Sequence, residues 1–235
     1  MRTALFDLDG TLLGFDIGRF FPPYMEALSR HLAPLLEPRD LAARMEEGLA
    51  ALYQAVDGRL RNAERFERVF YRGLGPGREA AVREAIDGFY REVFPALSGF
   101  SERWPEARVA VEAALAAGWQ VAVATDPVFP EAAIRERLRW AGLDDLPFSL
   151  VTTYEEMHYT KPHLGYYREI LERLGARPEE SWMLGNDMAQ DMVAAELGIH
   201  TFFVERLPKN LERARPVERR GDLDEVLRFF AGEAA

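Results

Sequence analysis

The stretch Thr-Ala-Leu-Phe-Asp-Leu-Asp-Gly-Thr, residues 3–11, predicts a buried parallel strand that ends in two acids. Its apolar run is too short for a helix. In extended backbone, residues i and i+2 point the same way, so the carboxylates of Asp7 and Asp9 are expected to meet at the carboxyl end of the strand. Two carboxylates in one place repel each other unless a cation or a proton lies between them. Because ligands bind at this end of the strands in open α/β sheets, the stretch indicates a functional site. The plain alternative is a strand followed by an ordinary Asp-Gly turn.

The composition is that of a folded protein with one large domain, or with a core domain and a smaller insert. The chain has 235 residues, of which 48% are hydrophobic. Its formal net charge of −10 argues against a general nucleic-acid binder. The absence of cysteine excludes disulfides and thiolate chemistry. No apolar run reaches membrane-spanning length, and the sequence starts in a strand instead of a signal peptide, so we expect a soluble cytoplasmic protein without a membrane partner.

Residues 14–95 have the pattern of a helical insert that follows the first strand. Apolar residues recur there at helical spacing in four segments, which are separated by breaks rich in Pro and Gly. The four apolar faces are Phe20/Tyr24/Leu28/Leu32, Leu41/Met45/Leu49/Leu52, Phe66/Val69/Phe70 and Val82/Ile86/Phe89/Val93. We therefore expect four helices that form a domain of their own, while residues 1–13 and 96–235 form the main domain. The alternative is that these helices simply cover the sheet.

The rest of the chain alternates short apolar runs with helical patterns, which predicts an α/β fold with a parallel sheet. Four more strands, which with the first give a sheet of at least five, are expected at residues 120–124, 148–152, 181–184 and 200–204. Helices are expected at residues 107–117, 129–140, 166–174 and 222–230.

Polar residues with possible chemistry lie in the connections between these elements. Thr125 directly follows the second strand, where a hydroxyl and the free backbone N–H groups of a helix start can hold an anion. Lys161 is one of only two lysines in the chain. Asp187 and Asp191 follow the fourth strand and a glycine. Each of these residues also has a structural interpretation, such as a helix N-cap or a solvated loop lysine.

Taken together, these residues resemble the four motifs of the haloacid dehalogenase-like hydrolase superfamily, in the same order along the chain. The motifs are Asp-x-Asp-x-Thr, a Ser or Thr after an apolar strand, a Lys that is often followed by Pro, and Gly-Asp with a second Asp four or five residues later. The matching residues are Asp7, Asp9 and Thr11, then Thr125, then Lys161-Pro162, then Asp187 and Asp191. Asn186 stands between Gly185 and Asp187, which departs from the usual fourth motif. The resemblance implies a Rossmann-like α/β core and makes residues 14–95 an all-helical cap that closes over the active site.

The resemblance also implies a role for each residue in a phosphatase that acts on a small phosphorylated metabolite. Asp7 is the nucleophile and forms an aspartyl-phosphate intermediate. Asp9 protonates the leaving alkoxide and then activates the water that hydrolyses the intermediate. Thr125 and Lys161 hold the phosphoryl oxygens, since phosphoryl transfer depends mainly on positioning and on electrostatic compensation.

A Mg²⁺ ion is the cofactor that the resemblance implies, and no residue is assigned to an organic cofactor. Its ligands are the carboxylates of Asp7 and Asp187 and the backbone carbonyl of Asp9, all hard oxygen donors. Asp191 does not bind the ion itself but supports the residues that do. The cation offsets the repulsion between Asp7 and the dianionic substrate.

Other reactions of the superfamily leave different marks on the sequence. Dehalogenases typically lack the second acid of the first motif, because a halide needs no proton, so Asp9 argues for phosphate. Phosphonate cleavage uses a lysine in the cap, and residues 14–95 contain none. A phosphomutase uses the same four motifs and stays open. So does a catalytically silent binding module, although all six expected side chains are present.

Asp126 departs from the second motif of the family, because a carboxylate beside the motif threonine Thr125 repels a phosphate. We expect it to turn away from the substrate and to cap the following helix, with Pro127 at the first helical position.

Overall fold

The computed structural model describes residues 1–54 and 57–232; residues 55–56 of the predicted insert and 233–235 of the predicted main domain lie outside the described residues. Within these ranges, six strands form one parallel sheet in the order β5-β4-β1-β6-β7-β8. They are β1 (Thr3–Phe6), β4 (Gln120–Val123), β5 (Leu150–Val151), β6 (Ser181–Gly185), β7 (His200–Val204) and β8 (Arg219–Gly221). The predicted parallel sheet of at least five strands is confirmed. The sequence pattern missed β8, because this strand at the edge of the sheet has no apolar run.

The first strand lies in the middle of the sheet. Phe6 is in register with Val123 on one side and with Leu184 on the other. The carboxyl ends of these three strands therefore lie side by side, and the polar residues that follow them share one edge of the sheet. The side chains of Leu5 and Phe6 are fully buried, and burial of each stabilises the fold by about 1.5–3 kcal/mol.

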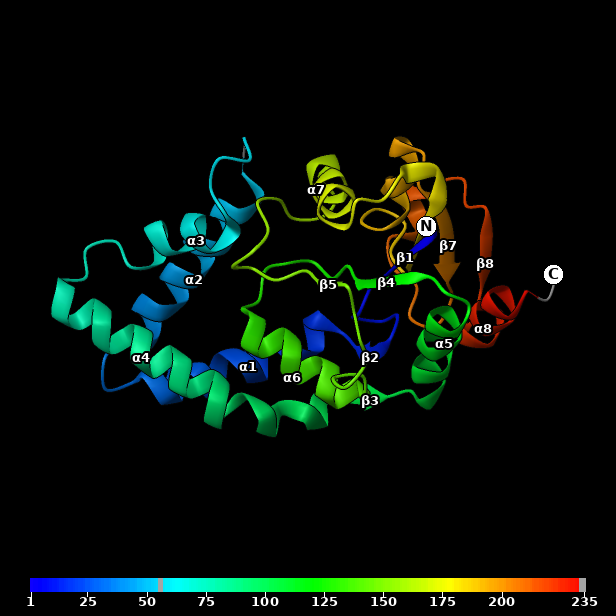
Figure 1. Ribbon diagram of the computed structural model, residues 1–235. Helices are drawn as coiled ribbons and strands as arrows, with labels where there is room; N and C mark the ends of the chain where they lie inside the picture. Colours follow the sequence, from blue (N-terminus) through cyan, green and yellow to red (C-terminus); the bar gives the residue numbers. More distant parts are fainter. Residues whose placement is uncertain (55–56, 233–235) are drawn as a thin grey trace.

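Helices cover both faces of the sheet (Figure 1). Helices α5 (Pro105–Ala116) and α8 (Leu223–Ala231) contact each other on one face, where the rings of Phe6 and Phe230 are 5.8 Å apart. Helix α7 (Leu164–Leu174) and the 3₁₀ helix η3 (Met192–Leu197) cover the other face and pack with Leu5. This alternation of Leu5 and Phe6 is what a strand buried on both faces requires.

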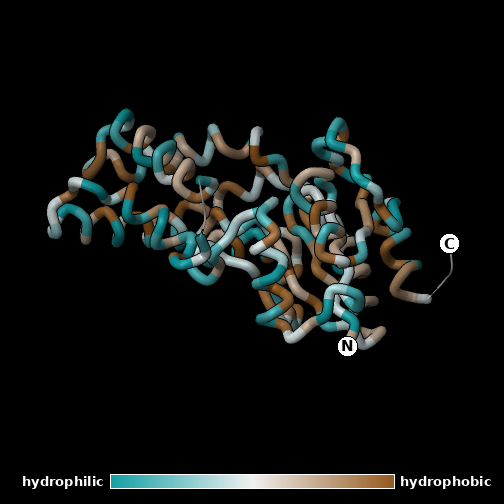
Figure 2. Tube along the Cα trace, turned by 90° about the horizontal axis from the view of Figure 1, so that it is seen from above, coloured by the Kyte–Doolittle hydropathy of each residue, from teal (hydrophilic) through white to brown (hydrophobic). Residues whose placement is uncertain are grey.

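The described part of the predicted insert forms four helices, which lie on the side of the molecule away from β8 (Figure 1). They are α1 (Ile17–Leu32), α2 (Pro38–Tyr53), α3 (Asn62–Phe70) and α4 (Pro76–Glu92). In Figure 2 hydrophilic and hydrophobic stretches alternate along them, and the predicted face Phe20/Tyr24/Leu28/Leu32 of α1 is buried. Two short strands that the sequence pattern missed, β2 (Leu13–Phe15) and β3 (Ser101–Arg103), pair antiparallel at the base of this unit.

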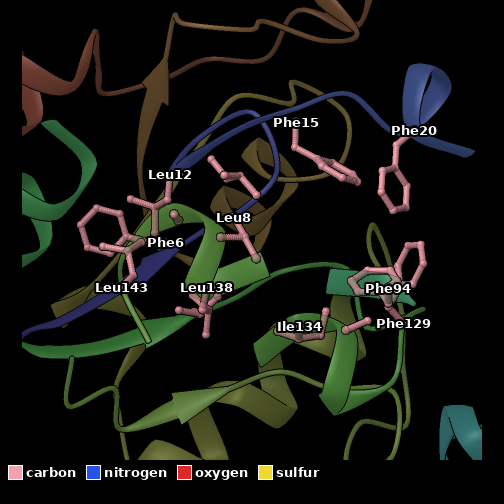
Figure 3. Packing of buried hydrophobic residues seen from close by; sticks show 14 of the residues in the cluster. Phe6, Leu8, Leu12, Phe15, Phe20, Phe94, Phe129, Ile134, Leu138 and Leu143 are labelled. Atoms are coloured by element: carbon pink, nitrogen blue, oxygen red, sulfur yellow. The ribbon is translucent and has the colours of Figure 1, made fainter. Parts of the chain in front are cut away.

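An aromatic cluster joins the helical unit to helix α6 (Glu131–Ala141) of the main domain. Figure 3 shows Phe15, Phe20, Phe94 and Phe129 gathered in one region. The rings of Phe15 and Phe20 are 4.7 Å apart, and the ring of Phe94, in the 3₁₀ helix η1 (Phe94–Phe100), stacks at 5.2 Å on Trp140 of α6. The four helices therefore share a hydrophobic core with the main domain.

Among the residues that the structure describes, no helix has both the length and the apolar character needed to cross a bilayer.

Candidate active site

The candidate site lies at the carboxyl edge of β1, β4 and β6. The backbone turns sharply at Gly10, whose φ is +86°. A Cβ atom at this position would lie 2.3 Å from Nδ2 of Asn186, so only glycine fits the turn beside the loop that follows β6. Glycine is therefore required here both for its backbone conformation and for the close approach of two loops.

Asp7 is held by a lysine and a threonine. The residue is 7% exposed. Oδ1 of its carboxylate accepts a hydrogen bond from Nζ of Lys161 at 2.8 Å, and Oδ2 accepts one from the hydroxyl of Thr11 at 3.1 Å. The Thr11 hydroxyl also lies 3.3 Å from Oδ1 of Asn186. The first, third and fourth predicted motifs thus meet around one carboxylate.

Lys161 links Asp7 to Asp191. Its side chain is 1% exposed, and Nζ donates to Oδ1 of Asp191 at 2.6 Å. Burial lowers the pKa of Lys161, but the charges of Asp191 and Asp7 outweigh burial and hold its pKa well above the usual value. Burial raises the pKa of Asp191 to about 7 against the opposing charge of Lys161. The lysine is therefore a fixed positive charge in the site.

Asp187 is oriented by backbone and amide groups. Its Oδ1 accepts hydrogen bonds from the backbone N–H groups of Ala189 and Gln190 at 2.8 and 2.9 Å. Nδ2 of Asn210 approaches both carboxylate oxygens, at 2.8 and 2.7 Å. The backbone N–H of Asp187 donates to Oδ2 of Asp191 at 3.0 Å, which places Asp191 behind Asp187. Asn210 lies in a loop 23 residues further on, and no sequence motif indicated it.

The predicted metal ligands fit a hard cation in their chemistry. Among the described residues, no three His, Cys, Asp or Glu side chains gather in a group that could hold a metal. The predicted set contains only two carboxylates, those of Asp7 and Asp187, together with the carbonyl of Asp9, so such a group is not expected. All three donors are oxygens, which Mg²⁺ prefers. Both oxygens of Asp7 and Oδ2 of Asp187 accept one hydrogen bond each, so each keeps a free lone pair for a cation.

The carboxylate of Asp9 does not pair with Lys161, the lysine that binds Asp7. Its Oδ2 is ion-paired with Nη1 of Arg137 on α6. The two carboxylates thus have different ion-pair partners, and the expectation that they meet at one spot stays a prediction. Burial raises the pKa of Asp9, the Arg137 guanidinium opposes this rise, and the charge of Asp7 adds to it. Arg137 was not predicted, since no motif indicates it.

Thr125 follows β4 beside Asp7 and is 1% exposed. The backbone N–H of Ala124 donates to the carbonyl of Phe6 at 2.7 Å, which continues the pairing of β1 and β4 up to the site. The Thr125 carbonyl accepts hydrogen bonds from the hydroxyls of Thr152 at 2.7 Å and Tyr166 at 2.8 Å. The backbone that presents Thr125 is thus fixed from the α7 side.

The predicted role of Asp126 as a helix cap is wrong. Helix α6 begins only at Glu131, after Pro130. A helix that started at Pro127 would place Pro130 where its ring meets the carbonyl of Asp126 and where the first intrahelical N–H is needed. The Asp126 carboxylate instead accepts hydrogen bonds from the backbone N–H of Lys161 at 3.0 Å and from the hydroxyl of Tyr53, at the end of α2, at 2.8 Å. It therefore connects the helical unit to the Lys161 loop.

The contacts of Asp126 predict a pH-dependent difference in stability. Burial raises the pKa of Asp126 from 3.8 to about 6, against the hydrogen bonds from Tyr53 and from the Lys161 N–H. Because the folded state binds this proton more tightly than the unfolded state, the stabilisation is present at low pH and is lost as the pH rises through about 6. The melting temperature of the wild type minus that of Asp126→Asn should therefore fall between pH 4 and 6, and a rise over this window would contradict the assignment.

A large cavity lies between the helical unit and the main domain. Its volume is about 890 Å³, and its walls are mostly aromatic and aliphatic. They include Tyr24, Leu49, Tyr53 and Phe66 from the helical unit and Phe129 from the main domain. None of the predicted catalytic residues is among the described residues of its walls, but Tyr53 connects the cavity to Asp126. The space is large enough for the part of a substrate that does not react.

Comparisons with known proteins agree on one family. The model of the haloacid dehalogenase-like hydrolases matches residues 1–198. The chain is 35% identical over 175 residues to phosphoserine phosphatase of Thermus thermophilus, and the match covers 72% of this chain and 65% of that protein. The chain thus spans slightly less than two thirds of that relative. Pyrophosphatase PpaX of Bacillus cereus is 22% identical over 196 residues, which cover 83% of this chain and 79% of that protein.

Solved structures share the same architecture. A phosphatase from Thermococcus onnurineus superposes with a TM-score of 0.59 at 21% identity and covers 99% of both chains. A protein described as a putative beta-phosphoglucomutase from Thermotoga maritima superposes with a TM-score of 0.56 at 21% identity, again over 99% of both chains. At these identities the likeness concerns the fold alone.

Proposed function

The chain belongs to the haloacid dehalogenase-like hydrolases, and on that premise we propose that it is a Mg²⁺-dependent phosphatase. Its substrate is a small phosphorylated metabolite, and the reaction passes through an aspartyl-phosphate on Asp7. The observation that carries the proposal is the buried Asp7 carboxylate between Lys161 and Thr11, linked through Lys161 to Asp191. A carboxylate in such a setting is a fixed nucleophile beside a fixed positive charge.

In the proposed reaction, an oxygen of Asp7 attacks phosphorus and the bond to the leaving oxygen breaks. Asp9 gives its proton to the leaving alkoxide. Asp9 then takes a proton from water, and the hydroxide attacks phosphorus, which releases phosphate and restores Asp7. Lys161 and Thr125 hold the phosphoryl oxygens throughout. Burial lowers the pKa of Lys161, but the charges of Asp191 and Asp7 raise it well above the usual value, so the lysine keeps its positive charge.

Asp7, Asp187 and the carbonyl of Asp9 would hold the Mg²⁺ ion, which supplies positive charge that offsets repulsion between the nucleophile and the phosphate. Asn210 and the N–H groups of Ala189 and Gln190 orient Asp187 for this role. These hydrogen bonds hold the Asp187 carboxylate in place before a cation binds.

Removal of divalent cations should reduce the activity. Wild-type protein stripped with a chelator is expected to lose at least about tenfold of its para-nitrophenyl phosphate hydrolysis, because a metal contributes several kcal/mol to charge stabilisation. Addition of Mg²⁺ should restore the rate. Asp187→Asn should need a higher Mg²⁺ concentration for half-maximal activity. Full activity in the chelator would contradict the metal proposal.

We propose that residues 14–95 act as the cap and that residues 1–13 and 96–235 carry the chemistry. Two features support the division: the antiparallel pair β2 and β3 at the base of the helices, and the Tyr53–Asp126 contact between the two parts. The aromatic cavity between them would receive the substrate part that does not react. A cytoplasmic location without nucleic-acid partners stays a prediction from the sequence.

The direct test is hydrolysis of para-nitrophenyl phosphate with and without Mg²⁺, followed by a panel of phosphorylated metabolites. Release of inorganic phosphate from a panel member supports a phosphatase. Transfer of phosphate between positions of a sugar without its release would indicate a mutase. Absence of both reactions, with the protein folded and Mg²⁺ present, would leave the binding-module alternative.

A further inference from the structure

Arg137 is a buried arginine with an unusual set of partners. Its side chain is 1% exposed, and Nη1 donates to Oδ2 of Asp9. Nε and Nη2 are buried and have no hydrogen-bond partner within the described residues. The guanidinium lies 4.7 Å from the ring centre of Phe129 and 5.3 Å from that of Phe15, two rings labelled in Figure 3. Asp9 is thus the one acid that holds this charge inside the described protein.

Stability does not account for this arrangement. Removing a guanidinium from water is costly, and two of its donor groups gain no hydrogen bond in return. Buried ion pairs are often no more stabilising than apolar residues of the same volume, so the pair is weak evidence for a structural role. The rings of Phe15 and Phe129 lie against the guanidinium, and its charged partner among the described residues is Asp9.

The two carboxylate oxygens of Asp9 also differ in whether they have a partner. Oδ2 takes the Arg137 ion pair, whereas Oδ1 is buried and has no hydrogen-bond partner within residues 1–54 and 57–232. A carboxylate held by one oxygen keeps its plane and leaves the second oxygen open for proton transfer. The same logic applies wherever a third group orients a catalytic base.

We propose that Arg137 is a positioning residue, which fixes Asp9 through Oδ2 so that Oδ1 exchanges protons with the leaving group and with water. This inference rests on the proposed function, because it depends on the role of Asp9 as the acid and base. It adds a residue of α6, which none of the four motifs contains. It also assigns different roles to the two basic side chains that are buried in the described residues: Lys161 pairs with the nucleophile, and Arg137 pairs with the acid.

The experiment compares kcat/KM for a simple alkyl phosphate with kcat/KM for para-nitrophenyl phosphate. This rate constant reports the transfer of the phosphoryl group to Asp7. Only the alkyl leaving group needs a proton from Asp9. Arg137→Met is expected to lower kcat/KM for the alkyl phosphate by roughly 10- to 100-fold, because misplacement of a reacting group by about 1 Å can cost about 100-fold. The loss for the nitrophenyl ester should be several-fold smaller. Arg137→Lys should recover part of the loss, and Arg168→Met, which removes an exposed arginine of α7, should change neither value.

A second comparison separates positioning from folding. Arg137→Met alone leaves the Asp9 charge without its partner and can lower the melting temperature. In the Asp9→Asn background both charges are removed, so this double variant tests the pair in a neutral site. We expect Arg137→Met to cause no further loss of kcat/KM in that background, because the group it positions is already gone.

Three results overturn the inference: equal losses for both substrates, a loss of the same size in the Asp9→Asn background, or no loss at all. In each of these cases the wild type still hydrolyses phosphate esters, so the proposed function stands. A folded wild type that hydrolyses neither ester and no member of the metabolite panel in the presence of Mg²⁺ overturns the proposed function, and the inference with it.

Discussion

Asp7→Asn is expected to lower the rate of phosphate release by at least about three powers of ten, because the variant removes the nucleophile itself. The side chain keeps its volume, and an amide oxygen can still accept the hydrogen bond that Lys161 donates to Oδ1. The fold should therefore survive. Steady-state hydrolysis of para-nitrophenyl phosphate measures the effect, and the melting temperature verifies the fold.

Asp224→Asn is the matched control for this variant. Asp224 is an exposed acid at the start of α8, far along the chain from the site, and the chemical change is the same. Its rate should equal that of the wild type. Retention of more than about a tenth of the wild-type rate by Asp7→Asn would correspond to a loss of less than 1.4 kcal/mol in transition-state stabilisation, and Asp7 would then not be the nucleophile.

Asp9→Asn should lower turnover of an alkyl phosphate by roughly 10²–10⁴-fold, the usual contribution of a positioned acid or base. With para-nitrophenyl phosphate, the rate of phosphoryl transfer to Asp7 should fall less, because nitrophenolate leaves without a proton. Asp7 is intact in this variant and keeps its contacts with Lys161 and Thr11. The variant should therefore still bind beryllofluoride, which mimics a phosphoryl group on a carboxylate.

The comparison of the two esters is an internal control for Asp9→Asn, since any loss from misfolding affects both equally. If kcat/KM fell by the same factor for alkyl and nitrophenyl esters, Asp9 would have no part in leaving-group protonation. Loss of beryllofluoride binding would show instead that Asp9 supports the phosphate site itself.

The short-range pattern of the sequence determined the elements and their order. Short apolar runs predicted β1, β4, β5, β6 and β7, and helical spacing predicted the four helices between β2 and β3. These signals are local, because a strand buried on both faces and a helix with one apolar stripe each need particular residues at fixed spacing. Parallel pairing then brings the ends of neighbouring strands together, so the sequence also indicated that Asp7 and Thr125 lie near each other.

Only the tertiary structure decided which charges pair. Asp7 and Asp9 are two residues apart, yet one binds Lys161 and the other binds Arg137, 154 and 128 residues further along the chain. The sequence places both acids after a strand, but the partner of each acid lies in a distant part of the chain that only the folded core brings to it.

Asp126 and Asn210 show the same limit. Asp126 has the sequence of a helix cap but accepts hydrogen bonds from Tyr53 and from the Lys161 backbone, and Asn210 reaches Asp187 from a distant loop. Contacts of this kind depend on the packing of whole elements, and they leave no spacing in the sequence from which they can be predicted. Local patterns determine where an acid stands along the chain, whereas its partner is determined by which helix or loop the folded core brings against it.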